Sequence, residues 1–454
     1  MQLFPSADKT IQGVVDALKS GRRTCVEVVE SSLAQIDEQE AKIHAWVNVD
    51  RDGALARARQ LDADLEAGRL QGSLHGVPIG IKDIVDVAGW PTAAGSELRA
   101  RQGVKAPHDA ALVRRLREAG AIILGKTVTT QFACFDPPAT RNPWNLDRTP
   151  GGSSSGSAAA VAAGMCLAAI GSQTGGSITR PTSFCGVAGC KPSFQRVSLD
   201  GVVPVAFSLD HPGPIARTVR DLGVMLDVLS GHNPRDPHSP DPPATNICAA
   251  LDADPLPAPK LGRLGGAFDE LADAEMREAF GRALSTLAEA GAAVGAATFP
   301  DDFESTRRFH RIVMAAEAAD WHEQRFSDHP DDYLPKLCRL IEDGLAIPAT
   351  RYIEARQHQE RLKRMMASCF GEMDVLVCPA TVGPAPDAST TGDPVFNSPW
   401  SYTGLPVVSF PMSLSADGLP LAIQLIGRPF GEADLFRAAL WCEREIQQAA
   451  AKSE

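Results

Sequence analysis

The sequence has no excess of basic residues. Its 454 residues include 44 lysines and arginines against 56 aspartates and glutamates, which gives a formal net charge of −12. Nucleic acids and anionic membranes attract proteins of the opposite charge, so neither is expected as a partner. The composition, 44% hydrophobic and 22% charged, is that of an ordinary globular protein able to bury a substantial core.

A long apolar run is also missing. The longest one, residues 158–171, is mostly Ala and Gly and is shorter than the roughly 18–20 residues that a membrane span needs. Residues 1–9 (MQLFPSADK) lack the basic and apolar regions of a secretory signal peptide. We therefore expect no membrane association and a cytoplasmic location.

The sequence lacks common metal-binding and disulfide patterns. Its ten cysteines are scattered without a C-x-x-C pair, and no histidine falls in an H-E-x-x-H motif. We expect the cysteines to be free thiols in a reducing compartment, and we expect no metal and no other cofactor.

Predicted helices and strands alternate along almost the whole chain. Thr24 and Glu27 form a T-x-x-E capping box that predicts a helix to about residue 36. A helix over residues 109–119 leads through a glycine into a strand over 121–124, a unit typical of α/β folds. This alternation favours one α/β domain over residues 1–454, with a mixed central β-sheet covered by helices.

Two regions depart from the alternation. Residues 231–259 are rich in Pro and Asp and are expected to be an exposed connection. Residues 303–370 are expected to be mostly helical and to be a variable region that helps to shape the substrate pocket.

Two loops rich in Gly and Ser, residues 149–157 and 173–178, flank an Ala-rich run. We expect residues 157–171 to form a buried helix and residues 172–192 to form a loop. Glycines allow such loops to turn backbone N–H groups toward a ligand, so three chemical interpretations compete.

Two of the interpretations lack part of their pattern. A phosphate-binding loop would have the motif G-x-x-x-x-G-K-[ST], which is absent. Residues 152–156 match G-x-S-x-G, but the nucleophile elbow of that motif follows a hydrophobic strand. The preceding residues 142–148 (NPWNLDR) do not predict a strand.

The third interpretation is a serine nucleophile with a lysine base. Ser177 follows Thr174-Gly175-Gly176, whose N–H groups suit an oxyanion hole. Lys82 ends the apolar segment 77–81, where desolvation would lower its pKa and yield a neutral amine. A neutral amine can accept a proton from a serine hydroxyl.

Five segments together resemble the motifs of the amidase signature family, and they cover nearly the whole chain. They are GVPIGIKDIVDVAGWPTAAGS (76–96), RNPWNLDRTPGGSSSGSAAAVAAG (141–164), SQTGGSITRPTSFCGVAGCKPS (172–193), SLDHPGPIARTVRDL (208–222) and GLPLAIQLIGRPFGEADLF (418–436). The resemblance implies the amidase signature fold and a serine amidohydrolase without a cofactor.

The resemblance also implies roles for individual residues. Position by position, the family's Ser–cis-Ser–Lys triad falls on Ser177 as nucleophile, Ser153 as relay and Lys82 as base. The peptide bond between Gly152 and Ser153 would be cis, and Ser154 would support the relay by hydrogen bonding. The oxyanion hole would consist of the N–H groups of Thr174, Gly175, Gly176 and Ser177.

Three positions depart from the family pattern. The family often has Asp at the position of Gln173 and Glu at the position of Gln131, and its Gly/Ser loop commonly has Gly at the position of Ser155. None of the three is a member of the implied triad, so amide hydrolysis remains the expected reaction. The charge around the site, and with it the substrate, stays open.

The leading hypothesis is a stand-alone amidohydrolase, monomeric or homodimeric, acting on a small amide-type substrate. Esters and carbamates carry a similar carbonyl and are possible substrates. Residues 132–140, 303–370 and 397–403 would shape the pocket, with Phe135, Trp400 and Tyr402 as candidate aromatic lining residues. The alternative hypothesis is the amidase subunit of a multi-subunit, glutamine-dependent tRNA amidotransferase.

Overall fold

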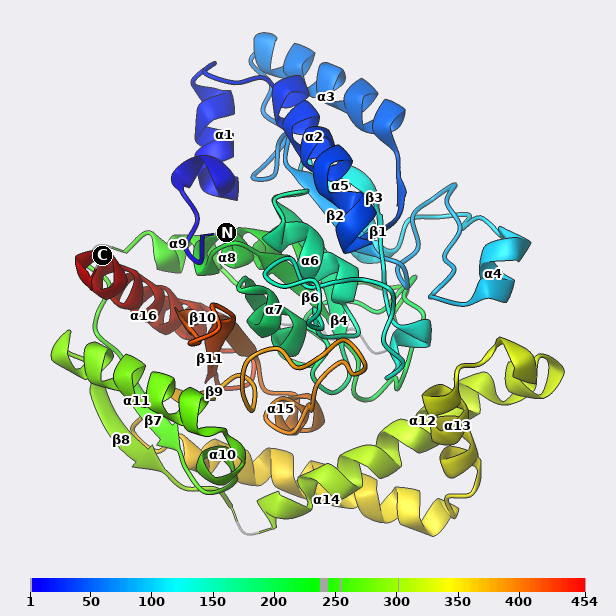
Figure 1. Cartoon of the computed structure of the whole chain (residues 1–454), viewed down its shortest axis with the longest axis vertical. Helices are drawn as coiled ribbons and strands as arrows, with labels where there is room; N and C mark the ends of the chain where they lie inside the picture. The colour runs from blue at the N-terminus through cyan, green and yellow to red at the C-terminus, as the bar shows by residue number, and fades with distance from the viewer. Residues whose placement is uncertain (1, 237–243, 254, 301, 454) are drawn as a thin grey trace.

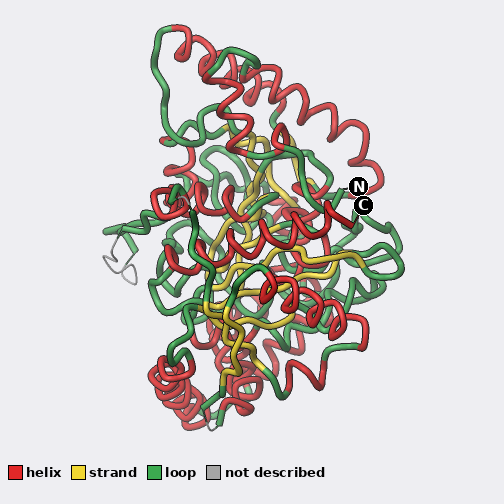
Figure 2. Tube along the Cα trace, turned by 90° about the vertical axis from the view of Figure 1, so that its left-hand side faces the viewer, coloured by secondary structure: helices red, strands yellow, loops and turns green. Residues whose placement is uncertain are grey.

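The computed structural model describes residues 2–236, 244–253, 255–300 and 302–453. Its described part contains one eleven-stranded sheet in the order β1-β3-β2-β4-β6-β5-β10-β11-β9-β7-β8. Figure 2 shows the strands running through the length of the molecule with helices on both sides. The strands are β1 (Trp46–Val49), β2 (Pro78–Lys82), β3 (Ile122–Thr127), β4 (Ala168–Gln173), β5 (Ala188–Lys191), β6 (His211–Ala216), β7 (Lys260–Leu264), β8 (Ala293–Ala297), β9 (Val375–Pro379), β10 (Val407–Leu414) and β11 (Pro420–Ile426).

The sheet is mixed, as predicted. Strand β2 runs parallel to both of its neighbours, β3 and β4, and β7 runs parallel to β8 and β9. The other pairings between named strands are antiparallel. The single α/β architecture with a large mixed sheet is therefore confirmed.

Helices cover the sheet along its whole length (Figure 1). The predicted capping box is present, since Thr24 and Glu27 exchange side-chain to backbone hydrogen bonds at the start of α2. The helices are α1 (Ile11–Lys19), α2 (Cys25–Ile43), α3 (Arg51–Glu66), α4 (Glu97–Gln102), α5 (Ala111–Glu118), α6 (Ser155–Ala162), α7 (Thr179–Cys185), α8 (Val219–Leu229), α9 (Ile247–Leu251), α10 (Ala267–Leu271), α11 (Ala274–Glu289), α12 (Thr306–Asp328), α13 (Pro335–Leu345), α14 (Ala349–Cys369), α15 (Ser398–Thr403) and α16 (Glu432–Ser453), with short 3₁₀ turns η1 (Ala7–Lys9), η2 (Gln131–Ala133), η3 (Phe303–Ser305) and η4 (Pro330–Asp332).

Two predictions around the Gly/Ser loops were wrong. Residues 157–171 are not one helix: α6 ends at Ala162, the chain turns through Gly164 at φ +71°, and β4 begins at Ala168. Residues 172–192 are not one loop, because they contain the end of β4, the helix α7 and the strand β5. These elements are buried on all sides, so their sequences carry no amphipathic period that separates helix from strand.

The two atypical regions have different outcomes. Residues 303–370 are helical, as predicted, and form α12, α13 and α14 along the lower edge of the molecule in Figure 1. Within residues 231–259, positions 237–243 and 254 lie outside the described residues. The described remainder includes α9, whose first N–H groups donate to the carboxylate of Asp227. No helix in the described part of the chain is long and apolar enough to cross a membrane.

Candidate active site

Lys82 is completely buried at the carboxyl end of β2. Its Nζ donates to the hydroxyl oxygens of Ser153 at 2.7 Å, Ser172 at 2.9 Å and Ser154 at 3.0 Å. Burial lowers the pKa of the Lys82 amine from 10.5 to about 7, and the negative charge of Asp210 partly opposes this effect. An amine in this setting is largely neutral just above neutral pH, so it can act as a proton acceptor.

The sheet explains why these groups meet. Strand β2 lies between β3 and β4, and β4 runs parallel to it, with Ile81 opposite Ile170. The carboxyl ends of the two strands therefore reach the same edge of the sheet, which brings Ser172 of β4 next to Lys82. Ser172 escaped the sequence analysis because its segment was predicted to be a loop.

The loop before α6 places the hydroxyl of Ser153 next to Lys82. The peptide bond between Gly152 and Ser153 is cis. The side chain of Arg180, from the first turn of α7, donates to the carbonyl of Gly152 at 2.7 Å. The hydroxyl of Ser155 donates to the carbonyl of Gly151 at 2.7 Å, so the departure at position 155 adds a hydrogen bond within the loop.

Ser177 lies in the loop between β4 and α7 and, with Ser153, lines a cavity of about 370 Å³. The carbonyls of this loop are all hydrogen-bonded: that of Thr174 to His310, that of Gly175 to Ser401 and that of Gly176 to the N–H of Arg180. A carbonyl and the N–H of the same trans peptide point in opposite directions. The N–H groups of residues 175–177 therefore point away from these partners, an arrangement suited to an oxyanion hole.

Gln173 holds the two ends of the same loop together. Its Oε1 accepts from the N–H groups of Ile178 and Thr179, at 2.9 and 3.0 Å, and from the Thr179 hydroxyl at 3.1 Å. Its Nε2 donates to the hydroxyl of Ser401 at 3.3 Å. The amide therefore serves as acceptor and donor at once, and it places no charge beside the loop that carries Ser177.

Gln131 joins the cavity wall to the turn between α12 and α13. Its Nε2 donates to the carbonyl of Asp332, and its Oε1 accepts from the N–H of Leu334 at 2.8 Å. A carboxylate at this position would have no donor for the Asp332 carbonyl. Gln131 is followed by Phe132 and Ala133, both with positive φ, and Ala133 lines the cavity.

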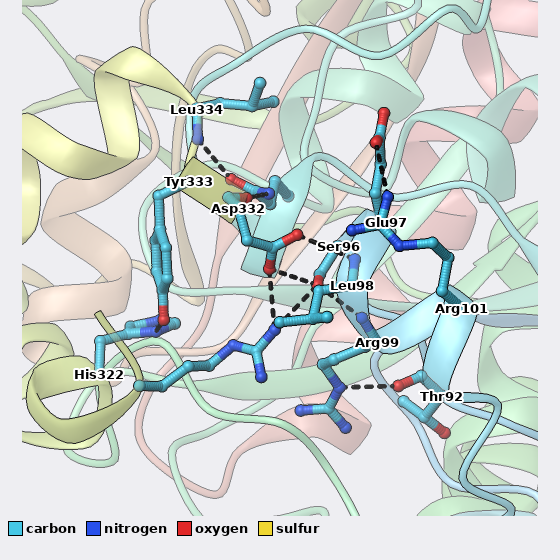
Figure 3. Close-up of polar contacts among 12 residues, drawn as sticks. Thr92, Ser96, Glu97, Leu98, Arg99, Arg101, His322, Asp332, Tyr333 and Leu334 are labelled. Carbon is cyan, nitrogen blue, oxygen red and sulfur yellow. Dashed lines mark hydrogen bonds and ion pairs between the residues drawn. The ribbon is translucent and has the colours of Figure 1, made fainter. Parts of the chain in front are cut away.

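The turn itself is held by a polar network (Figure 3). The carboxylate of Asp332 accepts from the hydroxyl of Ser96 at 2.6 Å, from the N–H of Leu98 at 2.9 Å and from the guanidinium of Arg325 at 2.8 Å. These contacts connect the start of α4 to the end of α12. The turn that Gln131 contacts is thus hydrogen-bonded both to the N-terminus of α4 and to the last turn of α12.

The three candidate aromatic residues have different positions. Phe135 lines the cavity, as expected. Trp400 and Tyr402 do not, and that expectation was wrong, because α15 turns both side chains into the core. Trp400 stacks on Phe268, and the Tyr402 hydroxyl donates to the carbonyl of Ala355.

The arrangement supports acyl transfer, and sequence similarity points to the same chemistry. A family model described as amidase matches residues 27–436. The chain belongs to the amidase signature family. The chain is 38% identical to an amidase of Pseudomonas putida, with 96% of this chain and 95% of that one aligned. It is 35% identical to a glutamyl-tRNA(Gln) amidotransferase subunit of Chloroflexus aggregans, with 94% of each chain aligned.

Solved structures agree with this assignment. The peptide amidase of Stenotrophomonas maltophilia superimposes with a TM-score of 0.86 at 29% identity, covering 98% of both chains. A protein from a vestigial complex related to the origins of an s-triazine catabolic enzyme gives a TM-score of 0.90 at 30% identity, covering 97% of this chain and 98% of that one. The resemblance recognised in the sequence is confirmed.

Proposed function

We propose that this protein hydrolyses a small linear amide through an ester formed on Ser177. The observation that carries the proposal is the buried 2.7 Å contact between the Lys82 amine and the Ser153 hydroxyl, beside a cavity that Ser153 and Ser177 both line. A cavity of about 370 Å³ is in the range of small-molecule sites.

In the first half-reaction, the oxygen of Ser177 attacks the carbonyl carbon of the amide. Its proton passes to Ser153, whose own proton passes to the neutral amine of Lys82. The N–H groups of Thr174, Gly175, Gly176 and Ser177 stabilise the oxyanion. The carbon–nitrogen bond then breaks, and the leaving amine takes the proton back from Lys82 through Ser153.

In the second half-reaction, a water molecule attacks the ester on Ser177. The water's proton follows the same path to Lys82, the bond between the carbonyl carbon and the serine oxygen breaks, and Ser177 regains a proton as the acid leaves. Ser154 supports the relay because its hydroxyl and that of Ser153 both hydrogen-bond to the Lys82 amine. Gly152 supports it through its carbonyl, which accepts from Arg180 and holds the loop that carries Ser153. Esters and carbamates present a carbonyl of similar shape and are included in the proposal.

The test is the variant Ser177→Ala, assayed on an acyl p-nitroanilide. Hydrolysis should fall at least about a thousandfold, because the group that forms the covalent intermediate is gone. Intact-protein mass spectrometry should detect the added acyl group on the wild type and not on the variant. Ser183→Ala is the matched control, since this α7 hydroxyl bonds to the carbonyl of Thr179 rather than lining the cavity. Wild-type turnover by Ser177→Ala would contradict the proposal.

A second candidate function is that of one component of a larger assembly that carries out glutamine-dependent amide transfer. It is favoured by the 35% identity to an amidotransferase component over 94% of both chains. Gel filtration of the purified protein, together with glutaminase assays with and without added partner proteins, separates the two. Activity of the isolated chain as a monomer or homodimer supports the stand-alone enzyme.

A further inference from the structure

The cavity beside Ser177 carries an excess of positive charge. Among the described residues that line it, three are basic, Arg180, Arg307 and Arg311, and one is acidic, Asp393. The other titratable groups there do not restore the balance. Burial lowers the pKa of the His310 imidazole and raises that of the Cys134 thiol to about 12, so both are neutral at pH 7.

Arg180 adds positive charge to the cavity and is hydrogen-bonded to carbonyls rather than to a carboxylate, although the charge of Asp393 acts on it from a distance. Its two Nη atoms donate to the carbonyls of Gly392 and Gly152 at 2.8 and 2.7 Å. Its Nε is buried and has no hydrogen-bond partner in the described structure. Burial lowers the pKa of Arg180 to about 10, so the guanidinium remains protonated at neutral pH.

Arg307 and Arg311 lie one turn apart on α12, at the mouth of the cavity. The guanidinium of Arg311 lies 5.4 Å from the centre of the Phe135 ring and donates to Asp343 at 2.8 Å. Arg307 is 3.9 Å from Asp393. Both ion pairs are solvent-exposed, with side-chain exposures of 41% and 53%, and of 73% and 48%. Exposed pairs are weak, so an anionic ligand can compete for either arginine.

We infer that the substrate carries a carboxylate, bound by Arg311 with help from Arg307, while its amide carbonyl faces Ser177. The inference rests on the proposed function and names the substrate class: amides that bear a free carboxylate, such as the half-amides of short dicarboxylic acids. A planar guanidinium placed against an aromatic ring is well suited to bidentate binding of a carboxylate. The charge of Arg180 attracts the same group into the cavity.

The experiment compares succinamate, glutaramate and adipamate with neutral amides in which an isopropyl group replaces the carboxylate. The wild type should hydrolyse the best of the three carboxylate amides with a kcat/KM at least about tenfold above that of its neutral counterpart. The preference should shrink as ionic strength rises, because salt screens exposed charges. Arg311→Gln should lower the carboxylate-to-neutral ratio about tenfold.

Arg308→Gln is the matched control. Arg308 lies on the same helix but packs on Phe309 instead of lining the cavity, so this variant should keep the wild-type ratio. Equal kcat/KM values for the two amides in the wild type would overturn the inference while leaving the proposed function intact. An equal effect of the two arginine variants on the ratio would also overturn it.

Binding measurements distinguish a failure of the proposed amide hydrolysis from a failure of the proposed carboxylate site. Calorimetry with the Ser177→Ala protein should detect tighter binding of the preferred carboxylate amide than of its neutral counterpart, whether or not the wild type turns either over. Tighter binding of the carboxylate amide without any turnover would reject amide hydrolysis and keep the carboxylate site. No difference in binding would reject the carboxylate site.

Discussion

The amine of Lys82 lies 2.7 Å from the hydroxyl of Ser153, although 71 residues separate the two in the sequence. Both side chains are removed from solvent. In the proposed mechanism, this contact couples the ionisation of the buried Lys82 to the reactivity of the neighbouring hydroxyls, so the pH dependence of the activity is its most direct test.

We expect kcat/KM for an amide to rise with pH through a midpoint near 7. Burial lowers the pKa of Lys82 to about 7, and only the neutral amine accepts the proton. Initial rates between pH 5 and 9 measure the profile, and Lys82→Met should abolish it. Lys191 is equally buried, with a pKa lowered to about 7, but it donates to the carbonyl of Pro192. Lys191→Met should therefore keep the wild-type midpoint. Wild-type activity that falls between pH 6 and 8 would contradict the assignment of Lys82 as the general base.

Asp210→Asn should move that midpoint to lower pH. The charge of Asp210 stabilises the protonated form of Lys82, so removing it lowers the pKa of the lysine further. Asp210 also accepts from the hydroxyl of Thr174, so kcat is expected to fall as well. Asp221→Asn is the control, because Asp221 is a buried residue of α8 that accepts from the N–H of Ile11, the first residue of α1. A midpoint that stays in place or rises in Asp210→Asn would contradict the electrostatic coupling.

Burial of the Lys82 amine should lower the free energy of unfolding of the protein. The folded state holds its proton only up to about pH 7, whereas the unfolded chain holds it to about pH 10.5. The cost is therefore complete below pH 7 and disappears as pH rises toward 10.5. Lys82→Met should raise the free energy of unfolding, on the order of a few kcal/mol at pH 6 and less at pH 9.5. Urea unfolding at the two pH values measures this; a gain that is independent of pH would refute the assignment to desolvation.

Gln131→Glu should loosen the cavity wall. The carboxylate cannot donate to the carbonyl of Asp332, and it leaves that half-buried acceptor without its partner at a cost of about 1 kcal/mol. Stability relative to the wild type should recover at acidic pH, where a protonated glutamate can donate again. Thermal unfolding at pH 7.5 and 5 tests this, with the exposed Gln357→Glu on α14 as control. A deficit that does not recover at pH 5 would mean that the donor is not what Gln131 contributes.

The sequence was informative where function imposes an unusual pattern. Two Gly/Ser loops and a lysine at the end of an apolar segment indicated the three groups that the fold brings to one edge of the sheet, and the capping box at Thr24 marked the start of α2. The elements between the loops could not be assigned, because α6 and β4 are made of small residues buried on every side.

Side-chain direction was also beyond the sequence. Phe135 and Trp400 are both aromatic residues in segments predicted to be variable, yet one lines the cavity and the other packs on Phe268. Arg180 lies in the segment 172–193 but was assigned no role there, and Arg311 lies in none of the five motifs. Their importance depends on how α7 and α12 pack against the cavity, which is set by contacts between distant parts of the chain.

The helix α12 borders the cavity but is not part of the sheet. Lys82, in contrast, ends the strand β2, and the loop that carries Ser177 follows the strand β4 (Figure 1). In the proposed mechanism, replacing an exposed residue such as Arg307 or Arg311 should therefore change which compounds bind in the cavity without disturbing the residues that act on the amide bond. Substitutions confined to one peripheral helix are thus a route, in evolution or in design, to a change in the substrate specificity of such an enzyme.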